Sequence, residues 1–348
     1  MLKTLVSGSV RAGCLGLLLL GSAAQAADYP KMRLRLAHFA PAGWTSSQVD
    51  QWFADEVAKR SDGAVKIEIH WAGELGNALE IVDQVTGGGV ALGATAGSYY
   101  PTRFPLSGMT NAVFMLFRDV AVAMDTQADL IANVPALTRE FESQKIVPVL
   151  NHGLAPYRLQ CTRPVRTMAD LSGIRVRTFG NYAPTLAKFL GMVPVNLQLN
   201  DLYDSLKRGI VDCVMLNNEV GVALKLHEVA RHWSTINFGA LSGYTLYASW
   251  TNWTGAWPRE VVDLFKTVAA EARTKEMADV AAAEERAAAW VRTVGVTIDE
   301  FEDQEAMVAV APDLLKQWAE TVLSQGAKPE DVQAIVQRVQ RKMTDANK

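Results

Sequence analysis

Apolar and polar residues alternate along several short segments near the N-terminus, with the two-residue period of β-strands. Residues 32–38 (MRLRLAH) and 64–70 (AVKIEIH) both show this alternation. Between them, residues 46–63 place valine, tryptophan and phenylalanine on one helical face, after a serine-rich start and before an Asp-Gly stop. Strands that alternate with helices in this way predict βαβ units and a mostly parallel sheet.

The α/β pattern continues in two series along the chain. A helix is predicted over residues 77–85, where it ends in three glycines, and buried strands are predicted at residues 90–94 and 144–153. A second α/β series begins at Tyr157. We therefore expect two α/β units, with the boundary near the middle of the chain.

The character of the sequence changes from Pro258 onward. Residues 258–295 are rich in alanine, glutamate, lysine and arginine, with proline near the start and glycine at the end. This composition predicts one helix of about 35 residues. Such a helix is longer than one small domain needs, so we expect it to run along two lobes. Glu284 and Glu285 are expected on its solvated face.

The N-terminus has the pattern of a secretory signal peptide. Lys3 and Arg11 precede an apolar run at residues 12–21, which is too short to span a bilayer. The small residues around Ala26 predict cleavage after that position, and Cys14 lies too early to be a lipid-modified cysteine. No later segment is apolar for long enough to cross a membrane, so we expect a soluble periplasmic protein.

Composition narrows the class of the mature chain. Removal of the first 26 residues leaves 322 residues with 32 basic and 37 acidic side chains. This length allows two domains with their own cores, and the acidic balance argues against binding to nucleic acid or anionic membranes. Cys161 and Cys213 remain; two buried free thiols are the favoured interpretation, with one disulfide as the alternative.

The usual motifs of catalysis and metal binding are missing from the sequence. His227 and His232 are five residues apart, about 140° around a helix, so they do not share a face as zinc-protease ligands do. The glycines at residues 87–89 follow a helix, whereas a phosphate loop precedes one. There is no nucleophile motif of the Gly-x-Ser-x-Gly type. We therefore expect ligand capture, with no enzyme activity, cofactor or metal.

One strand carries a candidate anion-binding residue. In residues 171–180 (LSGIRVRTFG), apolar side chains alternate with Arg175 and Arg177, and a turn follows. Ligands of open α/β sheets bind beyond the carboxyl ends of strands, where a guanidinium can grip a carboxylate with two hydrogen bonds. A salt bridge to a nearby acid, or a solvated strand edge, is the alternative for Arg177.

Three segments together resemble a known family, the DctP-type periplasmic solute-binding proteins of tripartite ATP-independent periplasmic (TRAP) transporters. Residues 52–76 look like its first helix, strand and loop, and residues 98–106 (SYYPTRFPL) look like a second signature. Residues 169–212 are the most specific part. They follow the family pattern Leu-x-Gly-Lys/Arg-x-Arg, a helix, Leu-Gly-x-x-Pro, and a helix that ends in Gly-x-Val-Asp.

The resemblance implies a two-lobed periplasmic-binding-protein fold of the α/β class, type II-like, with a long helix spanning both lobes. Lobe I would contain residues 27–154 and about 240–280, and lobe II residues 155–239 and about 281–348. The resemblance also implies a monomer that closes around one small organic acid. This acid would then be delivered to the cognate TRAP permease in the membrane, without ATP.

In this family an arginine at the position of Arg177 holds the ligand's carboxylate, and a second arginine matches Arg158. Leu216 occupies a position where the family commonly has asparagine, which argues against the sialic-acid branch, and two asparagines follow it. Aromatic residues near these segments and near the N-terminal loop are candidates to line the cleft. The full candidate set is Arg177, Arg158, Asn217, Asn218, Phe179, Trp44, Phe39 and Tyr100.

The ligand class is less constrained than the family. Apolar Leu216, the ring of Phe179 and the tryptophans of residues 250–257 favour an aromatic or apolar monocarboxylate, although core packing explains each aromatic equally well. A short dicarboxylate, a 2-oxo acid and a sulfonate stay open, as does a cation held near Glu219. Alternative functions are a sensory module for a membrane receptor or a hydrolase that uses the same cleft.

Overall fold

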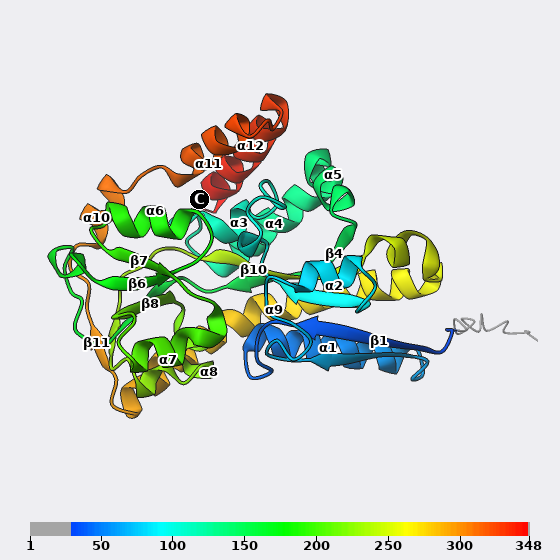
Figure 1. Ribbon diagram of the computed structural model, residues 1–348, viewed down its shortest axis with the longest axis horizontal. Helices are drawn as coiled ribbons and strands as arrows, with labels where there is room; N and C mark the ends of the chain where they lie inside the picture. The colour runs from blue at the N-terminus through cyan, green and yellow to red at the C-terminus, as the bar shows by residue number, and fades with distance from the viewer. Residues whose placement is uncertain (1–28, 347–348) are drawn as a thin grey trace, which may run out of the picture.

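The computed structural model describes residues 29–346, so the predicted signal peptide lies outside the described residues (Figure 1). Within this range the strands form two sheets, one in each of two lobes that lie side by side. The long helix α9 (Arg259–Thr293) runs along both. The two-lobed α/β architecture with a spanning helix is therefore as the sequence predicted.

The sheet of lobe I has the order β2-β1-β3-β10-β4. Strand β1 is parallel to β2 and β3, as expected for βαβ units, but β10 is antiparallel to both of its neighbours because it returns from the other lobe. Its strands are β1 (Met32–His38), β2 (Val65–His70), β3 (Leu92–Thr95), β4 (Ile146–Leu154) and β10 (Leu241–Ser249). Its helices are α1 (Thr45–Arg60), α2 (Ile81–Thr86), α3 (Met109–Ala112), α4 (Val120–Asn133) and α5 (Pro135–Ser143), with a 3₁₀ turn at Gly97–Tyr99.

The sheet of lobe II has the order β11-β9-β5-β8-β6-β7. Strand β6 is parallel to β7 and β8, whereas β5 is antiparallel to β8 and β9. Its strands are β5 (Arg158–Cys161), β6 (Arg175–Thr178), β7 (Val193–Asn196), β8 (Cys213–Leu216), β9 (His232–Ser234) and β11 (Thr297–Asp299). Its helices are α6 (Tyr182–Phe189), α7 (Leu202–Lys207) and α8 (Asn218–Ala223), with 3₁₀ turns at Ala169–Leu171, Leu199–Asp201 and Leu226–Glu228.

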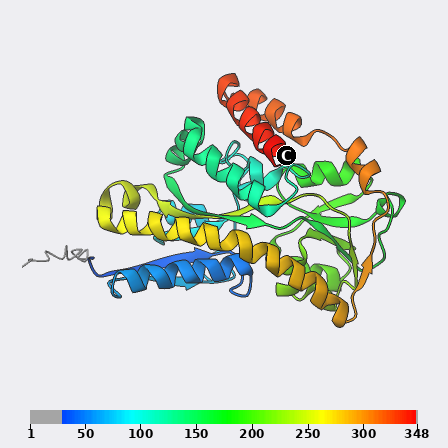
Figure 2. The same cartoon turned by 180° about the vertical axis from the view of Figure 1, so that it is seen from behind.

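Four connections join the lobes within residues 29–346, and the last of them passes through α10 (Gln304–Val310). The chain crosses at residues 155–157, between β4 and β5, and returns at residues 235–240, between β9 and β10. Helix α9 is the third connection, and it packs against α1, β4 and α8 (Figure 2). Pro258 precedes this helix and Gly295, with a φ of 84°, follows it, so its bounds match the proline and glycine signals in the sequence.

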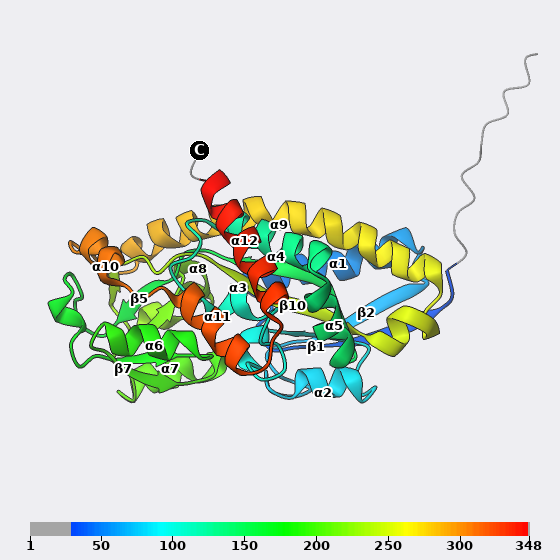
Figure 3. The ribbon, with the colours of Figure 1, turned by 90° about the horizontal axis from the view of Figure 1, so that it is seen from above.

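The C-terminal helices α11 (Leu314–Ser324) and α12 (Pro329–Asp345) pack on lobe I, after α10 (Gln304–Val310) connects them to lobe II (Figure 3). The buried indole of Trp318 donates to the carbonyl of Pro105 at 2.8 Å, and Arg338 pairs with Asp129 at 3.0 Å. The expected division placed residues 281–348 with lobe II, and these two helices depart from it. Their apolar faces bury against α4 and the loops beside it.

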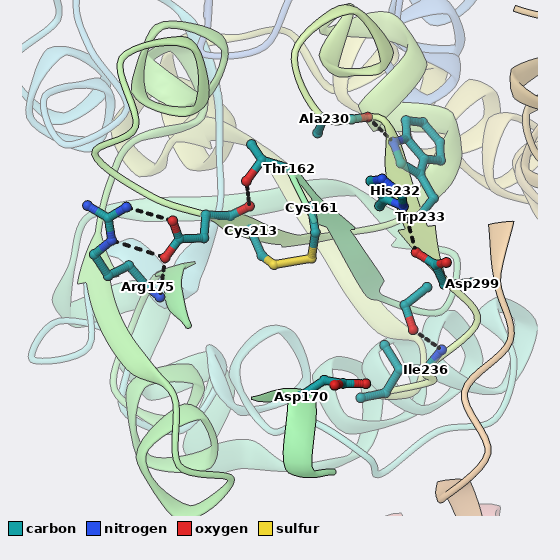
Figure 4. The surroundings of a disulfide bond; sticks show 12 residues. Cys161, Thr162, Asp170, Arg175, Cys213, Ala230, His232, Trp233, Ile236 and Asp299 are labelled. Carbon is teal, nitrogen blue, oxygen red and sulfur yellow. Dashed lines mark hydrogen bonds and ion pairs between the residues drawn. A yellow bond between two sulfur atoms is a disulfide. The ribbon is translucent and has the colours of Figure 1, made fainter. Parts of the chain in front are cut away.

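Cys161 and Cys213 form a disulfide in lobe II (Figure 4). They are direct register partners on the antiparallel strands β5 and β8, and both are fully buried. The favoured expectation of two free thiols was therefore wrong, because strand register was not visible in the sequence. Beside the disulfide, the guanidinium of Arg175 binds Asp212 through two nitrogens, at 2.6 and 3.0 Å.

Candidate functional site

A cavity lies between the two lobes and is lined by side chains from both. Its volume is about 20 Å³, enough for about one water molecule, so a larger molecule enters only if the walls move apart. The lining residues are mostly aromatic and aliphatic, with one charged side chain among the described residues. They are Phe39, Trp44, Ala96, Tyr99, Asn111, Leu154, Tyr157, Arg177, Phe179, Leu199, Leu216 and Tyr244.

Arg177 is the charged residue of this cavity. Arg175 and Arg177 lie two residues apart on β6, so their side chains leave the same face of the strand. Arg175, at the start of the strand, is exposed and pairs with Asp212, whereas Arg177, near its carboxyl end, is 1% exposed and lines the cavity. Its Nε donates to the carbonyl of Leu197 at 3.1 Å, and its guanidinium lies 4.6 Å above the ring of Phe179. No carboxylate in residues 29–346 pairs with it. Neither the expected salt bridge nor a solvated edge therefore accounts for this side chain.

The N–H groups on the two terminal nitrogens of Arg177 are free to donate to a ligand. A guanidinium carries five N–H groups in a planar fork, and the Leu197 carbonyl accepts the one on Nε. The structure gives the two terminal nitrogens no acceptor among the described residues. Their outward edge has the geometry that matches the two oxygens of a carboxylate.

Aromatic rings form much of the cavity wall. In lobe I, Phe39 lies 6.1 Å from Trp44 and 5.3 Å from Tyr244 between ring centroids. Across the lobes, Tyr99 lies 6.1 Å from Phe179 at a near-perpendicular angle. The structure thus brings together Arg177 and three of the predicted aromatic residues, Phe39, Trp44 and Phe179. Their roles in binding stay predictions.

A buried polar network lies directly behind this wall in lobe I. The hydroxyl of Tyr244 donates to Asp50 at 2.5 Å, and His38 contacts the same carboxylate oxygen at 3.0 Å. His152 bridges Asp50 at 3.1 Å and Glu276 at 2.9 Å. Burial lowers the pKa of His152, but the two carboxylates outweigh it and raise the value to about 10. His152 is therefore a cation with two anionic partners.

One hydrogen bond joins the lobes beside the cavity. The backbone N–H of Thr45, the first residue of α1, donates to Oε1 of Glu219 in α8 at 2.8 Å. Glu284 accepts in turn from the backbone amides of Asn218 and Glu219, at 3.2 and 2.9 Å, and its side chain is mostly buried. The expectation that Glu284 lies on a solvated helix face was therefore wrong. Burial raises the pKa of Glu219 to about 7.

Four predicted site residues lie outside the cavity lining. Arg158 donates to the carbonyl of Thr235 at 2.7 Å and lies 3.9 Å from Glu284. The other three form hydrogen bonds within the protein. The side chain of Asn217 accepts from the amide of Val220 and caps α8, and the backbone amide of Asn218 donates to Glu284. The hydroxyl of Tyr100 donates to the carbonyl of Ala78. These contacts explain their placement without a ligand.

Sequence reasoning missed several residues that do line the cavity. Tyr157 lines it, whereas its neighbour Arg158 does not, because successive side chains of an extended segment point to opposite sides. Tyr99 lines it in the same way beside Tyr100. Asn111 also lines it, and donates from Nδ2 to the carbonyl of Ser242 at 2.5 Å. Only the period-two alternation in residues 155–162 was available as a signal for Tyr157.

Residues 29–346 contain no cluster of three or more histidine, cysteine, aspartate or glutamate side chains that could hold a metal ion. None of the helices in this range is both long and apolar enough to cross a membrane.

Solved structures with the same fold come from several organisms. The chain superimposes with a TM-score of 0.78 on a marine metagenome TRAP solute-binding protein in complex with pyroglutamate, at 20% identity over 90% of this chain and 100% of that chain. It superimposes with a TM-score of 0.77 on DctP7 of Bordetella pertussis, an extracytoplasmic solute receptor that binds pyroglutamic acid, at 20% identity over 89% and 99% of the two chains.

Among curated proteins, the 2,3-diketo-L-gulonate-binding periplasmic protein of Escherichia coli is 25% identical over 178 residues, or 49% of this chain and 53% of the relative. The similarity thus spans about half the length of that relative. The matched proteins are solute-binding proteins, which confirms the expectation of a binding protein rather than an enzyme.

The sequence profile of one family covers most of the chain. It matches residues 36–321, which include both lobes and the whole cavity lining. This match and the solved structures confirm the predicted relation to the DctP-type receptors of TRAP transporters. The chain belongs to the DctP family, the bacterial extracellular solute-binding proteins of family 7.

Proposed function

We propose that this chain is the extracytoplasmic receptor of a TRAP transporter and that it captures a small organic acid between its lobes. The acid's carboxylate binds the guanidinium of Arg177, the lobes close around it, and the receptor delivers it to the membrane permease. One observation carries the proposal: a buried guanidinium that lines the cavity between the lobes and has no carboxylate partner among the described residues.

The energetics of Arg177 favour an anionic ligand. An isolated charge removed from water is costly unless it is paired and hydrogen-bonded. The contacts of Arg177 with Leu197 and Phe179 orient the guanidinium but supply no negative charge. A ligand carboxylate supplies that charge and two acceptors in one planar group. Closure is therefore coupled to the arrival of an acid, because the acid favours the closed state.

The cavity wall favours a singly charged acid with a flat or apolar body. Rings from both lobes, among them Phe39, Trp44 and Phe179, provide faces on which such a body can stack. Related proteins bind pyroglutamate, β-D-galacturonate and 2,3-diketo-L-gulonate. Organic acids with different bodies are thus accepted on this fold, and the wall of each cavity selects among them.

A thermal-shift screen of the mature protein tests the proposal. The panel contains L-pyroglutamate, phenylacetate, 4-hydroxybenzoate, 2-oxoisocaproate, D-galacturonate and succinate. A ligand at about 100 times its dissociation constant stabilises the protein by about 2.7 kcal/mol, which is a visible shift in melting temperature. We expect shifts with the monocarboxylates and none with neutral amides of the same acids. Stabilisation by the amides equal to that by the acids would contradict the assignment of Arg177.

Tryptophan fluorescence provides a second, local readout. Trp44 lines the cavity, so an acid that enters should change its emission during a titration. The matched control is Trp44→Phe, which keeps an apolar ring in the wall but removes the reporter. The change should vanish in this variant while calorimetry still detects binding. Delivery is tested separately, by uptake of the bound acid into liposomes that contain a TRAP permease.

A further inference from the structure

The resemblance to the family assigns one carboxylate-binding residue, Arg177, and a second arginine that the structure places outside the cavity. We propose that the hydroxyl of Tyr157 is the second donor to the ligand carboxylate held by Arg177, and that this neutral donor makes the site selective for singly charged acids. This inference rests on the proposed function and names the class of acid that the same site takes.

The backbone of Tyr157 is fixed where both crossing strands meet. Its N–H donates to the carbonyl of Gly239, and its carbonyl accepts from the amide of Phe238, both at 2.9 Å. Residues 155–157 and 235–240 are the two extended connections between the lobes. Tyr157 therefore occupies the hinge region with a fixed backbone, and its side chain lines the cavity from there.

The ring of Tyr157 shares its support with Arg177. Its centroid lies 6.1 Å from that of Phe179, which is the ring that lies under the guanidinium at 4.6 Å, and 5.6 Å from that of Phe114. Phe179 thus holds both groups on one side of the same cavity. An acid bound to the terminal nitrogens of Arg177 would meet the phenol of Tyr157 as a neighbour.

The hydroxyl of Tyr157 is available to a ligand. Tyr157 is 4% exposed, yet its hydroxyl makes no hydrogen bond with any residue in the described range 29–346. The hydroxyl oxygen keeps some solvent access, so a ligand in the cavity can reach it. Burial raises the pKa of this phenol above its ordinary value, although the charge of Arg177 opposes the rise. The group therefore remains a protonated donor at physiological pH, suited to a carboxylate oxygen.

The charges around the cavity give the selectivity. Of the side chains that line it within the described residues, only Arg177 is charged. The next charged groups outward are Asp50 and the cation His152 behind Tyr244, and Glu219 beyond Trp44; His152 is already bound by the carboxylates of Asp50 and Glu276 and has no charge left to offer a ligand. A single carboxylate neutralises Arg177, whereas a second carboxylate would enter a buried site without a counter-charge, which is costly. Arg158, the adjacent cation, contacts Glu284 and does not line the cavity.

Calorimetric titration of three variants tests the role of Tyr157. The probe is whichever monocarboxylate of the panel binds the wild-type protein most tightly. Tyr157→Phe deletes one hydrogen bond to a charged group, so its affinity should fall about tenfold to a hundredfold. The control is Tyr203→Phe, which removes a hydroxyl that bonds Glu228 on the surface of lobe II, and it should bind like the wild type. Arg177→Ala should show no measurable binding.

Two measurements on the wild-type protein make the test independent of how the variants fold. Succinate should bind at least about a hundredfold more weakly than the probe, because one of its carboxylates finds no cation. Ultraviolet difference spectroscopy should show a red shift of tyrosine absorption when the probe binds, as expected for a phenol that donates to an anion. The shift should be absent in Tyr157→Phe and present in Tyr203→Phe.

The possible failures are distinguishable. If no acid of the panel binds, or if Arg177→Ala binds normally, the proposed function fails. If Arg177→Ala abolishes binding while Tyr157→Phe stays within threefold of the wild type, the proposed function stands and the role of Tyr157 is overturned. Succinate affinity equal to that of the probe would overturn the selectivity for singly charged acids.

Discussion

Each lobe contains a buried cation, and the two cations have opposite surroundings. His152 in lobe I is fully buried and lies between Asp50 at 3.1 Å and Glu276 at 2.9 Å. Arg177 in lobe II is equally buried, but its Nε donates to a neutral backbone carbonyl, that of Leu197. The first charge is satisfied by the fold itself. The second has no anionic partner among the described residues, and we propose that the ligand supplies one; the first charge is then structural and the second serves binding.

The position of each cation fits this difference. His152 links β4 to α1 and α9 through Asp50 and Glu276, so its network ties the elements of lobe I together behind the cavity wall. Arg177 lines the cavity from β6, and within residues 29–346 no ion pair links it to a second element. Loss of the first charge network should therefore cost folding, and loss of the second charge should cost binding.

The largest effect is expected from Asp50→Ala. It removes one anionic partner of His152 and the acceptor of Tyr244, and leaves a fully buried cation with Glu276 alone. Breaking a buried charge pair costs about 3–5 kcal/mol, so the free energy of unfolding should fall by that amount. Chemical denaturation monitored by circular dichroism measures it. A loss below about 1 kcal/mol would mean that the network contributes little to the fold.

Arg177→Ala should have the reverse profile. Loss of a buried charge-assisted contact with the ligand costs about 2–5 kcal/mol of binding, whereas unfolding should change little because no protein carboxylate loses its partner. The matched control is Arg175→Ala on the same strand, which removes an exposed pair with Asp212. The control should bind the acid normally. Near-native affinity of Arg177→Ala in calorimetry would show that this residue is structural.

The sequence predicted most of the fold because its signals are local. The bounds of α9 follow from proline, glycine and composition, and β1 and β2 from alternation. Pairings between distant segments were not predicted. The disulfide of Cys161 with Cys213 depends on the register of β5 against β8, and the packing of α12 on α4 depends on which apolar faces meet. Neither can be obtained from the period of a single segment.

The site was predicted in part for the same reason. Alternation along β6 put Arg175 and Arg177 on one basic face, and the position of Arg177 near the carboxyl end of the strand singled it out; the structure places Arg177 in the cavity lining and Arg175 beside Asp212. The choice between Tyr157 and Arg158 required knowledge of which face of an irregular crossing segment meets the cavity. Arg158 was chosen from the sequence because it is cationic, but the structure places the neutral phenol of Tyr157 in the cavity wall.

A third prediction concerns pH and the contact between the lobes. Closure buries Glu219 against Thr45, and this burial raises its pKa from the ordinary value of 4.5 to about 7, although the Thr45 amide opposes the rise. A carboxyl whose pKa is higher in the closed state takes up a proton on closing. The affinity for the acid should therefore be highest at low pH, fall between about pH 4.5 and 7, and be constant above that range.

Glu219→Gln separates this effect from other titrations. The side-chain amide of the variant resembles the protonated carboxyl and still accepts from the N–H of Thr45. The affinity of this variant for the acid should therefore not vary between pH 5 and 8. The wild type should bind about seventyfold more weakly at pH 8 than at pH 5, because a pKa that rises from 4.5 to about 7 on closing favours the closed state by about that factor at pH 5 and hardly at all at pH 8. Two titratable or charged groups among the described residues face Glu219. One is Glu284, whose pKa is also raised by burial and which has Arg158 beside it, and the other is Arg286, which lines a surface pocket together with Glu219. An identical pH profile in both proteins would exclude Glu219 as the cause.

The smallest effect on binding is expected from Arg158→Ala, although this residue matches the family's second arginine. Its guanidinium bonds the carbonyl of Thr235 and contacts Glu284, and it is partly exposed to solvent. A partly exposed pair contributes at most about 1 kcal/mol, and that contribution belongs to the hinge and not to the cavity. We therefore expect an affinity within about fivefold of the wild type, measured by calorimetry with the acid that Arg177→Ala fails to bind. A loss of affinity as large as that of Arg177→Ala would show that Arg158 turns into the cavity when the acid is bound. Lobe II would then contain two arginines that serve binding, in contrast to the structural cation His152 of lobe I.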